Sequence, residues 1–272
     1  MMDVGKIGLT ASPTYKLLIA SIYITFIVKN LRFNFITNNM VEDITSRDSK
    51  QFHINLLGCR NLTFYNVAIS APKDSLNTDG IHIGRSSGID ITDSAIETGD
   101  DCVSISDGSG QINIQRITCG LGHGICVGSL GKYPDEESMV GISVKNCTFI
   151  NTQNGVRVKT WPASHQDTTS EMHLEDIVMN NVGNPIIIDQ KYCPHNQCNL
   201  KSLSRIKLSN VSFRNIQGTT STQVAVKLVC SQGVPCQDVE LGDNNGNEGL
   251  AMSQCKNIKP NLLDKQLPRT CA

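Results

Sequence analysis

Three aspartates and a histidine in the middle of the chain could together perform acid–base chemistry. The acids are Asp79, Asp100 and Asp101, and the imidazole is His123. The steps from Asp79 to Asp101 and from Asp101 to His123 are both 22 residues. Inverting glycoside cleavage needs one carboxylic acid to protonate the leaving oxygen and one carboxylate to direct a water to the opposite face of the sugar. The set therefore predicts cleavage of a glycosidic bond.

The equal spacing of these residues indicates how they could meet. A step of about 22 residues is close to one coil of a solenoid, and neighbouring strands lie about 4.8 Å apart. Adjacent residues on a regular strand face opposite ways, so Asp100 and Asp101 share a cleft only if a turn or bulge intervenes, which Gly99 allows. Crowded carboxylates predict that at least one has a raised pKa and keeps its proton. Turn-forming roles for the aspartates and for His123 are the alternative.

Two cations and a tyrosine follow the acids. Arg157 and Lys159 alternate on an expected strand and therefore share one face, where they could bind a sugar that carries carboxylates. A solvated basic strand paired with the aspartates is the alternative. Tyr192 lies in a polar stretch, where a substrate contact and an exposed loop tyrosine are equal possibilities.

The elements that must position these residues are short β-strands. Alternating β-branched segments recur at roughly 23 to 32 residues, separated by Asn, Asp, Gly and Ser, a spacing typical of solenoid repeats. A β-sandwich would instead show hairpins with two-residue turns at shorter intervals. We therefore predict an all-β, single-domain, right-handed parallel β-helix with ladders of turn Asn and Ser side chains. The repeating segments are 61–67, 88–93, 111–114, 141–146 and 206–211.

Composition limits the partners and the domain organisation. The 272 residues include 24 Lys plus Arg and 25 Asp plus Glu, so no global field would gather nucleic acid or an anionic membrane. Residues 17–28 are apolar but short for a membrane span, which leaves a signal-like or anchor-like segment and a buried strand as readings. We expect an atypical segment over 1–29 and the β-helix over 30–272. A surface loop is expected over 161–169, and strand signals fade beyond Gln237, where an end cap is expected.

Eleven cysteines favour disulfides and the secretory pathway. Zinc is the alternative, but no CxxC pair occurs, and we expect neither a metal nor a cofactor. The odd total leaves a free thiol, for which Cys59, Cys126 and Cys147 are the candidates. Three glycosylation sequons, at Asn61, Asn146 and Asn210, agree with secretion. The disulfide candidates are the closely spaced Cys102 and Cys119, Cys193 and Cys198, Cys230 and Cys236, and Cys255 and Cys271.

Four motifs make the chain resemble the plant polygalacturonases of glycoside hydrolase family 28, and most closely the exopolygalacturonase-like members. They are Asn77-Thr78-Asp79-Gly80, Gly99-Asp100-Asp101-Cys102, Cys119-Gly120-Leu121-Gly122-His123-Gly124 and Arg157-Val158-Lys159. The resemblance implies hydrolysis of α-1,4-galacturonosyl linkages in polygalacturonic acid with inversion, and exo action is part of that expectation. It also implies a secreted, monomeric protein of the plant cell wall whose partner is pectin.

The resemblance also implies roles. Asp100 would be the general acid, and Asp79 with Asp101 would activate the water. His123 would support the acid, while Arg157, Lys159, Tyr192 and Asn77 would bind substrate, and a Cys102–Cys119 disulfide would lie beside the site. Val158 and Leu121 are mild departures from the family pattern.

A larger departure is expected at the N-terminal end, because residues 1–29 do not resemble the family, and we expect its early coils to be absent from this chain. A solenoid without its cap exposes a strand edge. A catalytically impaired remnant or wall-binding protein and a calcium-dependent pectate lyase are therefore the alternative functions.

Overall fold

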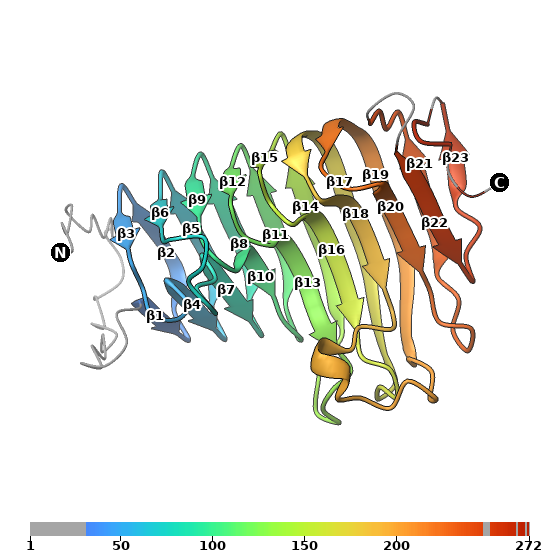
Figure 1. The fold of residues 1–272 in the computed structure, drawn as a ribbon. Helices are drawn as coiled ribbons and strands as arrows, with labels where there is room; N and C mark the ends of the chain where they lie inside the picture. The colour runs from blue at the N-terminus through green and yellow to red at the C-terminus, as the bar shows by residue number, and fades with distance from the viewer. Residues whose placement is uncertain (1–30, 247–250, 265, 270, 272) are drawn as a thin grey trace.

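Parallel strands stack coil upon coil along one axis in the computed structural model, which describes residues 31–246, 251–264, 266–269 and 271 (Figure 1). The chain is a right-handed parallel β-helix, so the predicted fold class is confirmed. Within the described ranges the only helical element is the 3-10 turn η1 (Pro194–Asn196), and no helix there is long and apolar enough to cross a membrane. The segment predicted to be atypical, 1–29, lies outside the described residues.

One sheet receives a single strand from each coil. Its nine strands run side by side in the order in which the chain supplies them, so residues one coil apart become neighbours. In spatial order they are β1 (Leu31–Asn34), β4 (Ile54–Leu57), β7 (Ile81–Gly84), β10 (Asp101–Ile105), β13 (Gly124–Leu130), β16 (Asn154–Thr160), β18 (Asn184–Asp189), β20 (Val224–Val229) and β22 (Met252–Lys256).

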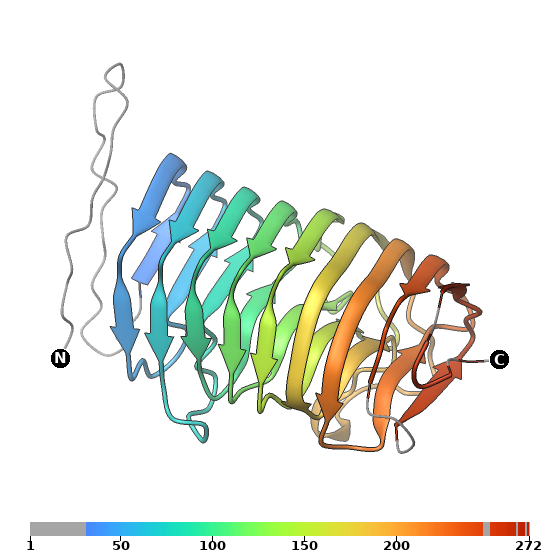
Figure 2. The ribbon, with the colours of Figure 1, turned by 90° about the horizontal axis from the view of Figure 1, so that it is seen from above.

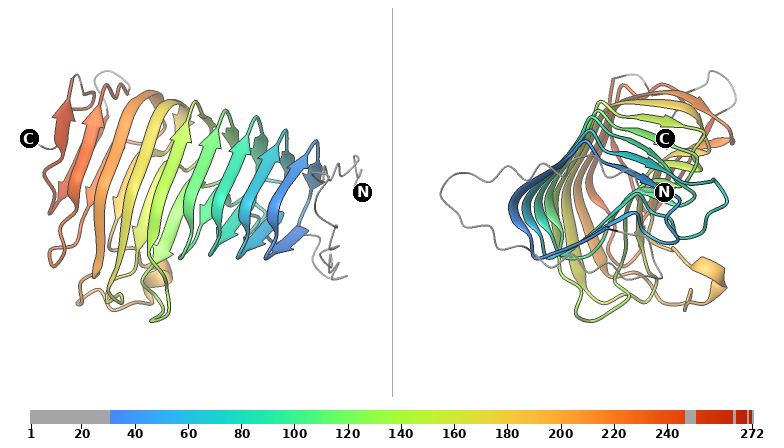
Figure 3. Two further views of the ribbon diagram at one scale, coloured as in Figure 1. Left: turned by 180° about the vertical axis from the view of Figure 1, so that it is seen from behind. Right: turned by 90° about the vertical axis from the view of Figure 1, so that its left-hand side faces the viewer.

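The second sheet has fourteen strands and closes the other sides of the coil (Figures 2 and 3). All five predicted repeat segments fall on its strands, one coil apart except between the last two, which confirms the repeat. The strands are β2 (Thr37–Glu42), β3 (Thr45–Arg47), β5 (Arg60–Tyr65), β6 (Ala68–Ser70), β8 (Ser87–Thr92), β9 (Ala95–Glu97), β11 (Gly110–Gln115), β12 (Thr118–Gly120), β14 (Met139–Lys145), β15 (Thr148–Ile150), β17 (Asp167–Val182), β19 (Ile206–Thr220), β21 (Gln237–Gly242) and β23 (Asn261–Leu263).

Aliphatic side chains fill the interior in continuous rows. Ile54, Ile81, Val103 and Ile125 are register partners on consecutive strands of the nine-stranded sheet, and all are buried. Because alternate residues on a strand point to opposite faces, the residues between them face outward. Branched side chains suit such pleated stacks. The interior rows therefore fix which residues line the outer face of this sheet.

Polar ladders follow the turns, as predicted. Asn61 donates to Asn38 at 3.0 Å and Asn66 donates to Asp43 at 2.6 Å, each across one coil. Asn61 and Asn66 have positive φ values of 52° and 51°, a conformation that Asn tolerates better than most residues. Asn61 lies near the start of β5 and Asn66 in the turn after it, so both ladders run along corners of the coil and tie successive coils together.

Two boundaries expected from the sequence are wrong. The expected loop 161–169 ends earlier, because Asp167–Thr169 already pair with Ile206–Leu208 in β17 and β19. Strands also continue past Gln237 as β21, β22 and β23. Residues 252–256 pair with β20 despite their polar character, because a neighbouring coil supplies the hydrogen-bonding edge.

Four disulfides connect the cysteines predicted from close spacing. They are Cys102–Cys119, Cys193–Cys198, Cys230–Cys236 and Cys255–Cys271. The last joins β22 to the closing segment, as expected for the end cap. Cys59, Cys126 and Cys147, the candidates for free thiols, are free and buried.

A buried histidine on the second coil gives the fold a pH dependence. His53 is fully buried and its Nδ1 lies 2.8 Å from Ser46 Oγ, whereas its Nε2 has no hydrogen-bond partner among the described residues. Burial, opposed only in part by Asp48, lowers the pKa of His53 to about 4. Between about pH 6.5 and 4 the unfolded chain therefore binds a proton at His53, whereas the folded chain does not.

His53 should therefore cost stability as the pH falls from about 6.5 to 4. In His53→Gln, which can keep the bond to Ser46, we expect this acid loss to shrink by on the order of 2 to 3 kcal/mol. Urea unfolding at pH 7, 5.5 and 4 measures it. Parallel losses in the two proteins would show that His53 is not the titrating group.

Candidate active site

The nine-stranded sheet brings the three aspartates to neighbouring coils. Asp79 lies two residues before β7, and Asp101 opens β10. Gly80 N donates to Asp101 O at 2.9 Å, and His123 N donates to Asp100 O at 2.9 Å, so each coil is tied to the next at this point. The predicted stacking across steps of about 22 residues is therefore present.

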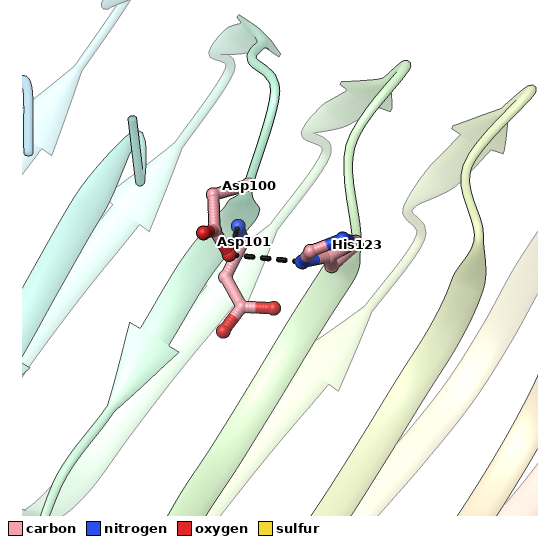
Figure 4. Close-up of side chains that lie close together, drawn as sticks. All are labelled: Asp100, Asp101 and His123. Carbon is pink, nitrogen blue, oxygen red and sulfur yellow. Dashed lines mark hydrogen bonds and ion pairs between the residues drawn. The ribbon is translucent and has the colours of Figure 1, made fainter. Parts of the chain in front are cut away.

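An irregular backbone lets the two adjacent aspartates contribute together, as the sequence required. The register between β10 and β13 shifts between Asp101 and Val103, and Asp100 precedes the strand. Figure 4 shows Asp100 above the start of the strand, directed toward His123, and Asp101 extending below it. Gly122 permits the close approach, because a Cβ there would lie 1.9 Å from Asp100 O. Thr78 Oγ1, which accepts from Gly99 N at 3.1 Å, fixes the turn before Asp100.

Asp100 and His123 form a partly exposed pair. Asp100 Oδ1 lies 2.9 Å from His123 Nδ1 and accepts from Asp101 N at 2.8 Å. Burial acts to raise the pKa of Asp100, but the hydrogen bond and charge of His123 outweigh it, so the pKa is lowered. In the unliganded protein Asp100 is therefore an ionised carboxylate that His123 holds in position.

Asp101 is the carboxylate that the cations neutralise. Its Oδ1 lies 3.4 Å from Arg157 Nη2 and its Oδ2 lies 3.5 Å from Lys159 Nζ. The Asp101 side chain is 6% exposed and those of Arg157 and Lys159 are 16% and 10% exposed. Burial acts to lower the pKa of Lys159, but the nearby Cys126 and Asp101 outweigh it and raise the pKa. The buried Nε of Arg157 has no partner in the described part of the chain.

Asp79 carries the raised pKa that crowding predicts. It is 7% exposed. Burial first, and then the charges of Asp101 and Asp100, raise the pKa of Asp79 to about 7, against the lowering effects of Ser104 and Lys159. The proton expected among the three carboxyl groups thus resides on Asp79 in the unliganded protein below about pH 7.

Tyr192 and Asn77 have different relations to this cluster. The Tyr192 ring lies 5.0 Å from Lys159 Nζ and 5.9 Å from Arg157 Cζ, so it adjoins the cations. Trp161 contacts the same ring edge to face at 5.9 Å. Asn77 is exposed and adopts a positive φ of 54° in the turn before Asp79, and the structure gives it no contact with the cluster.

Sequence reasoning missed three residues on the outer face of the sheet. His82, Ser104 and Cys126 are register partners in one row, and that row continues to Arg157. Ser104 Oγ is hydrogen-bonded to Asp79 Oδ2 at 2.5 Å. The signal was available, because His82 and Ser104 stand three residues after Asp79 and Asp101 and share their 22-residue step.

The cluster has acidic and imidazole groups but its charges are already balanced by side chains. Atoms of Asp100, Asp101 and His123 lie within 4.8 Å of one another. A cation there would compete with Arg157 and Lys159 for Asp101, so we assign no metal to these residues.

The model of the family "Glycosyl hydrolases family 28" matches residues 27–267. The chain belongs to this family. It is 57% identical to an exopolygalacturonase of Oenothera organensis over 89% of this chain and 68% of that protein, and 56% identical to a polygalacturonase of Nicotiana tabacum over 89% and 62%. The chain thus spans 62 to 68% of the length of these two relatives.

A solved structure shares the fold. The endo-xylogalacturonan hydrolase from Aspergillus tubingensis matches with a TM-score of 0.75 and 25% identity, over 83% of this chain and 64% of that one. The family match and the two relatives confirm the resemblance to glycosyl hydrolase family 28 stated from four motifs.

The raised pKa of Asp79 predicts that the free energy of unfolding depends on pH. The folded chain holds a proton between about pH 4 and 7 that the unfolded chain has released, so stability falls as the pH rises from about 4 to 7. Asp79→Asn removes the buried charge, and we expect it to be more stable than the parent at pH 8 by on the order of a few kcal/mol, with little difference at pH 4. Thermal unfolding at both pH values measures this. Equal effects at pH 4 and 8 would contradict it.

Proposed function

We propose that the chain hydrolyses α-1,4-galacturonosyl linkages in polygalacturonic acid by single displacement with inversion. The observation that carries this proposal is the stacking of Asp79, Asp100, Asp101 and His123 on successive coils, beside the cations of β16. The two relatives, a polygalacturonase and an exopolygalacturonase, support the same substrate. The arrangement supplies acid, base and anion-binding groups on one face.

Asp100 is the general acid in this proposal, and Asp79 with Asp101 directs the water. Asp100 is the most exposed of the three and can reach a leaving oxygen, whereas Asp101 lies against two cations. The three groups share one proton. A galacturonate residue brings a negative charge and displaces water from Asp100, and both effects raise the pKa of that acid. Substrate binding thus transfers the acidic role to Asp100, provided that Asp79 is ionised.

Arg157 and Lys159 bind the carboxylate of the substrate. Both are largely buried, so their interaction with an anion is less screened than that of surface cations. The Tyr192 ring closes this side of the site and offers a face for the sugar, whereas Asn77 contributes through the turn that leads to Asp79.

The remaining properties of the protein are proposed from its relatives and its disulfides. We propose exo action, because the relative with the highest identity given above is an exopolygalacturonase. Four disulfides fit an oxidising compartment and hence secretion to the cell wall. The proposed unit is one β-helix domain over 30–272 that acts as a monomer.

Asp100→Asn keeps the shape of the side chain but removes the acid. We expect release of reducing sugar from polygalacturonate to fall by roughly a thousandfold or more, because leaving-group protonation is lost. The parent should release the β-anomer first, visible by proton NMR, and monomer alone early in digestion. An unsaturated product that absorbs in the ultraviolet and disappears with a chelator would instead indicate a lyase.

Lys159→Met should weaken recognition of the anionic substrate. We expect KM for polygalacturonate to rise roughly tenfold, with a smaller effect on methyl-esterified polymer, because one charge-assisted contact is lost. Lys145→Met is the matched control, since Lys145 pairs with Glu175 on the other sheet at 2.9 Å. Equal losses on both polymers would contradict a role in carboxylate binding.

A further inference from the structure

A chain of hydrogen bonds leads from the buried Asp79 toward the surface. Ser104 Oγ lies 2.5 Å from Asp79 Oδ2 and 2.8 Å from His82 Nδ1. Asp79 and Ser104 are 7% and 4% exposed, whereas the side chain of His82 is 25% exposed. The hydroxyl can donate to one neighbour while it accepts from the other. The three groups therefore form a continuous path from a buried acid to a solvent-accessible imidazole.

The fold holds this path rigidly. His82 and Ser104 are register partners on β7 and β10, so both project from the outer face of the sheet at the same level. The ring of Phe52 stacks on His82 with centroids 4.5 Å apart and planes at 17°, which fixes the imidazole plane. Burial, opposed by Asp101 and Asp107, lowers the pKa of His82, so its ring is neutral at pH 7 and offers one donor and one acceptor.

We propose that Ser104 and His82 form a proton relay that ionises Asp79 while substrate covers the cleft. The proposal rests on the proposed function, because only a base in that reaction needs Asp79 ionised. The Asp79 Oδ2–H bond breaks as a Ser104 Oγ–H bond forms. The original hydroxyl proton passes to His82 Nδ1, and His82 Nε2 releases its proton to solvent water. The negative charge appears on Asp79 alone, His82 stays neutral and changes tautomer, and the reverse sequence returns the proton.

Burial is the main cause of the raised pKa of Asp79, and charged groups around the relay modify it. They come from the preceding coil, from β10 and its turn, and from β16. Because Asp79 loses its proton near pH 7, the relay operates in the neutral range. The groups are His53, whose N donates to Asp79 O, the acids Asp100, Asp101 and Asp107, the Arg85 that pairs with Asp107, and the cations Arg157 and Lys159.

Nitrogen-15 NMR of histidine-labelled protein tests the relay without any need for activity, with His82→Ala assigning the signals. We expect the His82 tautomer to change from Nε2–H to Nδ1–H as the pH rises through about 7, in step with Asp79. The change should vanish in Asp79→Asn and in Ser104→Ala. A His82 tautomer that ignores the Asp79→Asn substitution would overturn the proposal.

Kinetics test the same relay in turnover. In Ser104→Ala and His82→Ala we expect kcat to fall roughly 10- to 100-fold with KM nearly unchanged, since proton transfer typically contributes factors of this order or more. Ser104→Thr, which keeps a hydroxyl, should restore most of the rate, and added imidazole should rescue His82→Ala. The matched controls are His173→Ala and Ser212→Ala, whose Nδ1 and Oγ lie 2.8 Å apart on the other sheet. They should leave kcat unchanged.

The outcomes separate the relay from the proposed function. Loss of kcat without rescue by imidazole or by threonine would reduce the pair to a structural support and overturn the relay. A parent protein that shows the tautomer change but hydrolyses no polygalacturonate would overturn the proposed function and leave the proton path standing. Hydrolysis by the parent without a tautomer change would overturn the relay alone.

Discussion

The burial of a surplus of carboxylates at one level of the solenoid is the constraint on which the site depends. Asp79 and Asp101 are nearly removed from water, and Asp100 is close enough to influence the Asp79 charge. A buried cluster of carboxylates is stable only if a proton, a cation or a hydrogen bond offsets each negative charge. The negative charge is offset differently at each aspartate: by a retained proton at Asp79, by two cations at Asp101 and by an imidazole at Asp100. One residue type thereby provides three chemically different groups.

The regular register of the solenoid places the compensating groups beside the buried acids. Every coil adds a strand to the nine-stranded sheet, and the interior rows of Ile and Val hold the outward rows in fixed register. A row one residue out of step would turn its side chains into the core. The cations of β16 can therefore reach an acid of β10 two strands away without any special loop. The long-range pairing of strands serves as the scaffold for the electrostatics.

Asymmetry between Asp79 and Asp100 connects the unliganded state to catalysis. In the unliganded protein the proton lies on Asp79 and Asp100 is ionised, whereas the proposed reaction needs the opposite distribution. The substrate can raise the pKa of Asp100, and the path through Ser104 can remove the proton from Asp79. Two events on opposite sides of the cluster would then establish the reactive state. This division explains why both a cationic face and a buried hydroxyl adjoin the acids.

Much of this protein was determined by its sequence alone. The coil-length steps between Asp79, Asp101 and His123, and the alternation of Arg157 with Lys159, predicted a stacked cleft, because parallel coils convert sequence periodicity directly into proximity. The repeat predicted the fold, and the close cysteine spacing predicted which cysteines are candidates for disulfides. Strands such as β22 escaped prediction because pairing with a neighbouring coil, not their own pattern, makes them strands. Only the tertiary structure decided which acid keeps the proton and that Ser104 links it to His82, since desolvation and charge sum over several strands at once.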